Sequence, residues 1–86
     1  MIIDGKDLFR LYATDGLSLA DALILSRDSG FRLDVPAFVK SARLDGWTLE
    51  KIQSVLKEAY RDGLGYKDGS LRLLEELTKI AYLDHS

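Results

Sequence analysis

The stretch from Asp45 to about Arg61 constrains the fold most, because a well-marked helix start leads into a long one-sided apolar pattern. Thr48 can cap this helix, since its hydroxyl can accept a hydrogen bond from a free amide of the first turn. Trp47 and Ile52 occupy the two positions of a hydrophobic staple around that cap. Apolar residues then recur at three- and four-residue steps at Leu49, Ile52, Val55, Leu56, Ala59 and Tyr60. We therefore expect the other helices to pack against this one, with Trp47 buried.

Four more segments carry similar start and stop signals. Besides residues 48–61, helices are predicted over about residues 4–14, 18–29, 34–44 and 70–81. Their N-caps are Asp4, Ser18, Asp34 and Ser70, residue types whose side chains accept hydrogen bonds from the first turn. A glycine follows closely after the predicted end of each of the first three of these helices, as is common at helix ends. Residues 63–69 contain three glycines and are predicted to form a mobile connection.

The last predicted helix, which Ser70 would cap, is rich in leucine. We expect it to bury its apolar residues Leu71, Leu73, Leu74, Leu77, Ile80 and Ala81. Glu75 and Lys79 have the four-residue spacing that favours an ion pair on the outer face.

Length and composition define the class of protein. Eighty-six residues with 47% hydrophobic content fit one small domain. We predict an all-α fold, a compact single-domain bundle of about five short helices over residues 1–86. The chain has no cysteine, which excludes disulfides and is compatible with a reducing compartment. No apolar run approaches the roughly 18 residues of a membrane span, so we expect a cytoplasmic protein without membrane contact.

The acidic residues are explained by helix ends rather than by catalysis. Most aspartates fall at predicted caps or first turns, where they stabilise the helix dipole, and the glutamates fall on solvent faces. The only histidine, His85, lies next to last, without neighbours for a base or a metal ligand. Nucleophile-elbow, phosphate-loop and dinucleotide-binding strings are absent. We predict a protein that is not an enzyme, with no catalytic residue, metal or cofactor.

Two groups of residues are candidates for binding. Leu64 and Tyr66 lie in the glycine-rich connection and could contact a partner protein, since aromatic side chains with few torsions are favoured at interfaces. They could equally fold back over the core. Arg32, Lys40 and Arg43 could form a basic patch for phosphate contacts. Such a group is more often a solvated surface, and the net charge of -2 does not attract nucleic acid to the whole molecule.

The first half of the chain resembles a known family. Residues 3–16 read I-D-G-K-D-L-F-R-L-Y-A-T-D-G, which is similar to the F-x-L-Y-D-T-Y-G-F-P segment of alanyl-tRNA synthetases, just after their catalytic core. The similarity continues without gaps at Leu19, Arg27, Asp28, Leu33, Asp34 and Phe38 and covers about residues 2–43. The sequence departs from the family at Ala13, Asp15, Leu17 and Ser18, and its second half is unmatched. The resemblance implies a helical unit from the tRNA-recognition region, without the motifs that bind ATP and alanine.

These observations favour a small helical binding module that contacts another protein in a regulatory or adaptor role. The alternative is an accessory domain that binds tRNA or another nucleic acid, which the resemblance favours. The predicted third and fourth helices could then form a helix-turn-helix. Against this alternative, the outer face of the 48–61 helix mixes Glu50 and Glu58 with basic residues, whereas recognition helices are usually more basic. The sequence does not favour any oligomeric state.

Overall fold

The computed structural model describes residues 2–3, 9–10, 13, 16, 18–30 and 32–84. This part of the chain contains four helices, α2 (Leu19–Asp28), α3 (Val35–Leu44), α4 (Leu49–Leu64) and α5 (Asp68–Leu83). Two very short strands, β1 (Ile2–Ile3) and β2 (Arg32–Leu33), pair in parallel. The all-α prediction is confirmed, apart from this pair of strands. Four helices are described where about five were predicted, and the predicted helix over residues 4–14 lies mostly outside the described residues.

Three of the predicted N-caps are confirmed. The side chains of Ser18, Asp34 and Thr48 each accept a hydrogen bond from the backbone amide three residues later, at 3.2 to 3.3 Å. Each bond satisfies an amide that has no partner within the helix. These caps fix where α2, α3 and α4 begin.

The connection between α4 and α5 is shorter than predicted. Helix α4 continues to Leu64 and ends at Gly65, whose φ of 69° is the left-handed conformation that glycine adopts without strain. Helix α5 begins at Asp68, so the predicted Ser70 cap lies inside the first turn, and the N-cap position belongs to Lys67. Residues 65–67 alone join the two helices. The connection is therefore three residues long, where the sequence predicted seven over residues 63–69.

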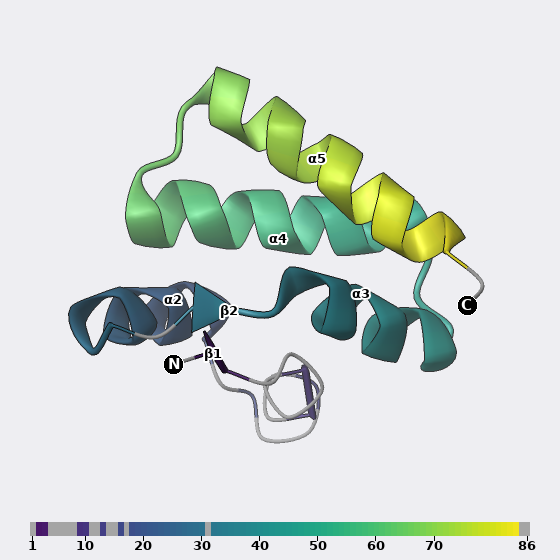
Figure 1. Cartoon of the computed structure of the whole chain (residues 1–86), viewed down its shortest axis with the longest axis horizontal. Helices are drawn as coiled ribbons and strands as arrows, with labels where there is room; N and C mark the ends of the chain where they lie inside the picture. The colour runs from purple at the N-terminus through teal and green to yellow at the C-terminus, as the bar shows by residue number, and fades with distance from the viewer. Residues whose placement is uncertain are drawn as a thin grey trace.

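Helix α4 is the centre of the packing. It packs against α2 and α5, while α3 packs chiefly against α5. In Figure 1, α4 runs between α5 and α2, and α3 continues beyond α2 toward the C-terminal end of α5. The core side chains that are fully inaccessible to solvent include Phe38 and Val39 of α3 and Ile52 and Leu56 of α4. The expectation that the other helices pack against α4 holds for α2 and α5.

Trp47 is partly buried and packs against the core, so the prediction of a buried tryptophan is confirmed only in part. Its indole packs edge-on against Phe9, with ring centroids 5.2 Å apart, and Phe9 in turn packs edge-on against Phe38 at 5.3 Å. The Lys51 ammonium lies 4.1 Å from the centre of the indole ring. Trp47 therefore covers the edge of the core and also takes part in a cation–π contact.

Helices α2 and α4 approach each other closely at Gly63 and Ala20. A β-carbon at Gly63 would lie 2.7 Å from the carbonyl oxygen of Ala20 and 3.1 Å from its α-carbon. Both atoms belong to the backbone of α2, so no side-chain rotation could relieve the clash. The distance between the two helices thus depends on a glycine in the last turn of α4.

We predict that Gly63→Ala destabilises the protein by about 1 to 3 kcal/mol, because overpacking separates α2 from α4. This loss opposes the helix propensity of alanine, which by itself would stabilise the helix by about 1 kcal/mol. Gly69→Ala in α5 is the matched control, since a β-carbon there meets no atom within 4 Å. Urea unfolding followed by circular dichroism measures both variants. Equal stability of Gly63→Ala and the wild type would contradict the close approach.

Candidate functional site

Helix α5 has two apolar faces, and the described residues cover only one of them. Leu71, Leu74, Thr78 and Ala81 face the core and are buried. The other face carries an exposed row, here called the α5 stripe, formed by Leu73, Leu77, Ile80 and Leu83. The side chains of the stripe are between 51% and 65% exposed. The prediction that Leu73, Leu77 and Ile80 are buried is therefore wrong.

The spacing of the residues explains the error. At 100° per residue, Leu74, Thr78 and Ala81 lie along one side of the helix, and Leu73, Leu77 and Ile80 lie about a quarter turn or more away. A helix at the edge of a bundle can bury only the part of its circumference that its neighbours reach. Apolar residues all around a helix predict burial on all sides, and in the described structure no element covers the outer face of α5.

Polar contacts with α4 and α3 fix the orientation of α5. Near its middle, the Lys57 ammonium binds the Glu75 carboxylate at 2.8 Å, and the Gln53 amide donates to the Glu75 carbonyl at 3.1 Å. The hydrogen bond and the charge of Lys57 lower the pKa of Glu75. Glu75 therefore pairs with Lys57 and not with the predicted Lys79. These contacts present the α5 stripe on a helix of defined orientation.

The C-terminal end of α5 is held by α3. Lys40 forms an ion pair with the Asp84 carboxylate at 3.6 Å, and Arg43 donates to the Asp84 carbonyl at 3.2 Å. The Arg43 guanidinium also lies 5.6 Å from the centre of the Tyr82 ring. Cations near a helix C-terminus interact favourably with its carbonyl groups. Lys40 and Arg43 thus lie together, as predicted for a basic patch, but they bind the end of α5.

Arg32 does not share this position. It lies in β2, where its backbone pairs with Ile2, before α3 begins. Arg43 lies in the last turn of α3, so the length of that helix separates the two residues. The structure therefore brings Lys40 and Arg43 together and places the backbone of Arg32 before the other end of α3.

Leu64 and Tyr66 lie at a recess between α2, β2 and the end of α4. The recess has a volume of about 390 Å³, and its lining includes Leu23, Leu33 and Tyr60. Leu64 is partly buried against the core. The Tyr66 ring packs on Tyr60 with centroids 5.0 Å apart and keeps 39% of its surface exposed. The structure thus brings both predicted partner contacts to one recess, although much of each side chain packs against the protein itself.

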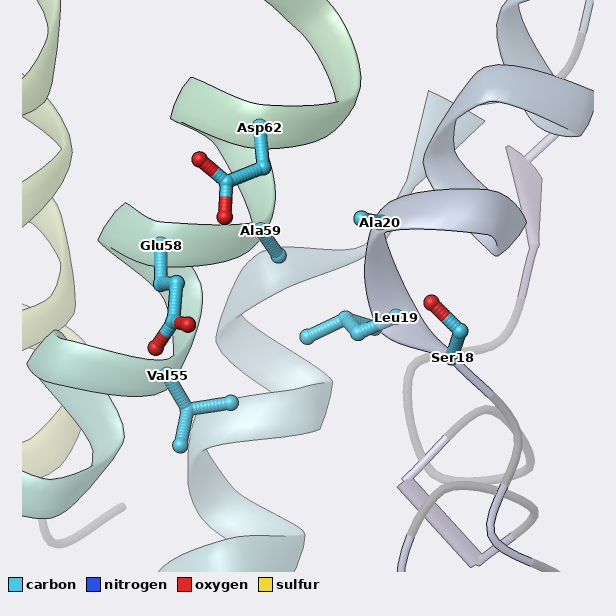
Figure 2. A pocket seen from close by; sticks show the side chains of 7 residues that line it. All are labelled: Ser18, Leu19, Ala20, Val55, Glu58, Ala59 and Asp62. Atoms are coloured by element: carbon cyan, nitrogen blue, oxygen red, sulfur yellow. The ribbon is translucent and has the colours of Figure 1, made fainter.

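A second recess, of about 280 Å³, lies between the start of α2 and the middle of α4 (Figure 2). Leu19, Val55 and Ala59 give it an apolar lining, and the carboxylates of Glu58 and Asp62 lie on its α4 side. The sequence assigned these two acids to a solvent face and a helix end. Their proximity to α2 follows from the close packing of the helices and could not be read from the sequence.

Two further properties bear on the possible chemistry. Among the residues with described positions, no three acidic or histidine side chains gather closely enough to hold a metal ion. Within the same residues, no helix has both the length and the apolar composition needed to cross a membrane.

Comparison of the chain with known protein families, with curated proteins and with solved structures finds no match. The similarity of residues 2–43 to alanyl-tRNA synthetases therefore stays a prediction from the sequence. The α5 stripe contains four of the seven large apolar side chains that are exposed in the described structure, and the sequence pattern did not predict it.

The Tyr60 hydroxyl supplies a test of the packing around the first recess. Burial, together with the nearby Tyr66, raises the pKa of Tyr60 from 10.0 to about 12. Between pH 10 and about 12, the folded protein therefore keeps the proton that the unfolded chain releases. The contribution of Tyr60 to stability is full below pH 10 and is lost as the pH rises toward about 12.

We expect Tyr60→Phe to lose less stability than the wild type over this alkaline range, in urea unfolding measured at several pH values. The ultraviolet absorbance of tyrosinate should also show one late-ionising group in the wild type that Tyr60→Phe lacks. An identical alkaline decline in stability for both proteins would show that Tyr60 is not shielded as described.

Proposed function

We propose that this protein is a small non-enzymatic helical module that acts by contact with another protein, in a regulatory or adaptor role. The observation that carries the proposal is the α5 stripe. Single exposed apolar residues are ordinary on protein surfaces, whereas contiguous apolar patches commonly mark interaction sites. Leu73, Leu77 and Ile80 lie within about 60° of one another around α5, and Leu83 extends this exposed surface at the end of the helix, so the stripe belongs to the second kind.

The spacing of the stripe matches a known mode of recognition. Leu73, Leu77, Ile80 and Leu83 follow one another at intervals of four, three and three residues. This is the anchor spacing with which an amphipathic helix contacts an apolar groove or another helix. Because α5 is already folded and held at Glu75 and Asp84, binding through it requires little ordering of the backbone.

The stripe supports a modest affinity. Completing the burial of four side chains that are about half exposed would contribute roughly 3 to 7 kcal/mol. Association itself costs an estimated 4 kcal/mol or more in lost rigid-body freedom. Further contacts must therefore add to the stripe, and a reversible, regulated complex fits this balance better than a permanent one.

Leu64 and Tyr66, the contacts predicted from the sequence, have a smaller part in the proposal. Tyr66 retains an exposed portion beside an apolar recess, where a partner side chain could insert. Both residues also pack on the core. Changing them would therefore mix effects on stability with effects on binding, which makes the α5 stripe the better target for testing.

Leu77→Gln combined with Ile80→Gln removes the centre of the stripe without changing the net charge or blocking the helix. Affinity capture from the source cell should recover one or more proteins with the wild-type chain and lose them with this double variant. Leu25→Gln is the matched control, because Leu25 is 68% exposed on a different helix, α2. Recovery of the same proteins by the double variant and the wild type would contradict the proposal.

The competing proposal is an accessory domain that binds tRNA or another nucleic acid. It rests on the synthetase resemblance and on the proximity of Lys40 and Arg43 at the end of α5. Phosphate contacts would have to compete with Asp84 for these two side chains. The net charge of -2 also opposes binding to a polyanion.

We predict no complex with tRNA or duplex DNA tighter than about 10 μM near physiological salt. Fluorescence anisotropy at several salt concentrations measures the affinity, and phosphate contacts would make it fall steeply as salt rises. A submicromolar complex that weakens when Arg32, Lys40 and Arg43 are replaced by alanine would favour the nucleic-acid proposal. Circular dichroism must show that this variant still folds, since two of these residues hold α5.

A further inference from the structure

We infer that the partner of the α5 stripe is a second copy of the same chain, paired antiparallel about a two-fold axis beside the middle of α5. This inference rests on the proposed function, because it takes the stripe to be the contact surface. It adds the identity of the occupant, the direction of pairing and the residues that face each other.

The charges beside the stripe are the first reason. Arg72, Glu76 and Lys79 are exposed and lie on one side of the line from Leu73 through Leu77 to Ile80. In an antiparallel pair of identical helices, a two-fold axis perpendicular to the helices brings the same side of both copies together. A row of charges that alternates positive, negative and positive can then pair with its own copy.

The positions of these charges agree with the position of the stripe. The stripe extends from Leu73 to Leu83, so its middle lies near residue 78. With the axis close to that point, Glu76 of one copy lies opposite Lys79 of the other to within about one residue, or 1.5 Å along the helix. The symmetry produces the reciprocal contact as well. The same arrangement therefore buries the apolar row and forms two ion pairs.

The size of the surface sets the expected strength. The stripe is about 15 Å long, and four half-exposed side chains offer much less than the roughly 800 Å² per partner of a standard stable interface. The small net charge of -2 gives little long-range repulsion between copies. We therefore expect a weak dimer, with a Kd between about 10 μM and 1 mM.

Sedimentation equilibrium on the intact chain, from about 10 μM to 1 mM, tests the dimer. The wild type and the Leu25→Gln control should shift from monomer to dimer over this range. Leu77→Gln combined with Ile80→Gln should remain monomeric while keeping the helical circular dichroism of the wild type. A wild type that is monomeric at 1 mM overturns the inference.

Charge exchange tests the facing residues. Glu76→Lys and Lys79→Glu should each weaken the dimer about threefold to thirtyfold, because each replaces two attractive pairs by repulsive ones. The double variant Glu76→Lys with Lys79→Glu should recover most of the wild-type affinity. Equal weakening in the double and single variants would overturn the proposed pairing of these two residues.

Cysteine variants test the direction, since the natural chain has no cysteine. Leu77 lies near the proposed axis, so Leu77→Cys should form an intermolecular disulfide readily. The two copies of residue 73 would lie about 15 Å apart along the helices, beyond the roughly 7 Å limit between the α-carbons of a disulfide, so Leu73→Cys should not cross-link. Equal cross-linking of both variants would show parallel pairing and overturn the antiparallel arrangement.

These results separate the inference from the proposed function. If the chain remains monomeric but captures another protein through Leu77 and Ile80, the second copy is rejected and the protein-binding function stands. If the chain neither dimerises nor captures a protein through these residues, both are rejected. Dimer formation that depends on the stripe supports the second copy and the stripe as a contact surface, and capture of a different protein stays the separate test of the proposed function.

Discussion

The close approach of α2 to α4 is the constraint on which the rest of the structure depends. Gly63 allows the backbone of α2 to lie against α4 without a side chain between them. This contact places Leu19 and Leu23 of α2 beside the apolar face of α4, where they join the core. Because α2 occupies this side of α4, α5 packs along another side, and the arrangement leaves the outer face of α5 uncovered. A missing side chain thus helps to determine which apolar surface remains available for binding.

Local signals predicted the starts of the helices well, because capping depends on residues close in sequence. Ser18, Asp34 and Thr48 bind amides only three residues away, so the sequence contains both partners. The start of α5 was missed because Lys67 forms no side-chain cap, and its first turn contains the Ser70 that would otherwise have marked the start. A prediction from capping residues fails where a helix begins without one.

The candidate site was harder to predict, because it depends on which neighbours reach each helix. Leu71 and Leu73 are the same residue type two positions apart, yet one is buried and the other is exposed. Composition does not distinguish them. Lys40 and Arg43 were predicted to lie together, and they do, but their contact with Asp84 joins residues more than forty positions apart and comes only from the fold. The recess at Leu64 and Tyr66 likewise requires residues from α2 and β2.

The contacts of Gln53 and Lys57 with Glu75 have a consequence for the uniqueness of the fold. A helix with leucines on two faces could rotate about its own axis and bury the other face at little hydrophobic cost. The two polar contacts can form in only one of these orientations, so they select it, whatever their contribution to total stability. Without them, only the contacts of Lys40 and Arg43 with Asp84 would oppose a rotation of α5 that presents a different row of leucines to solvent.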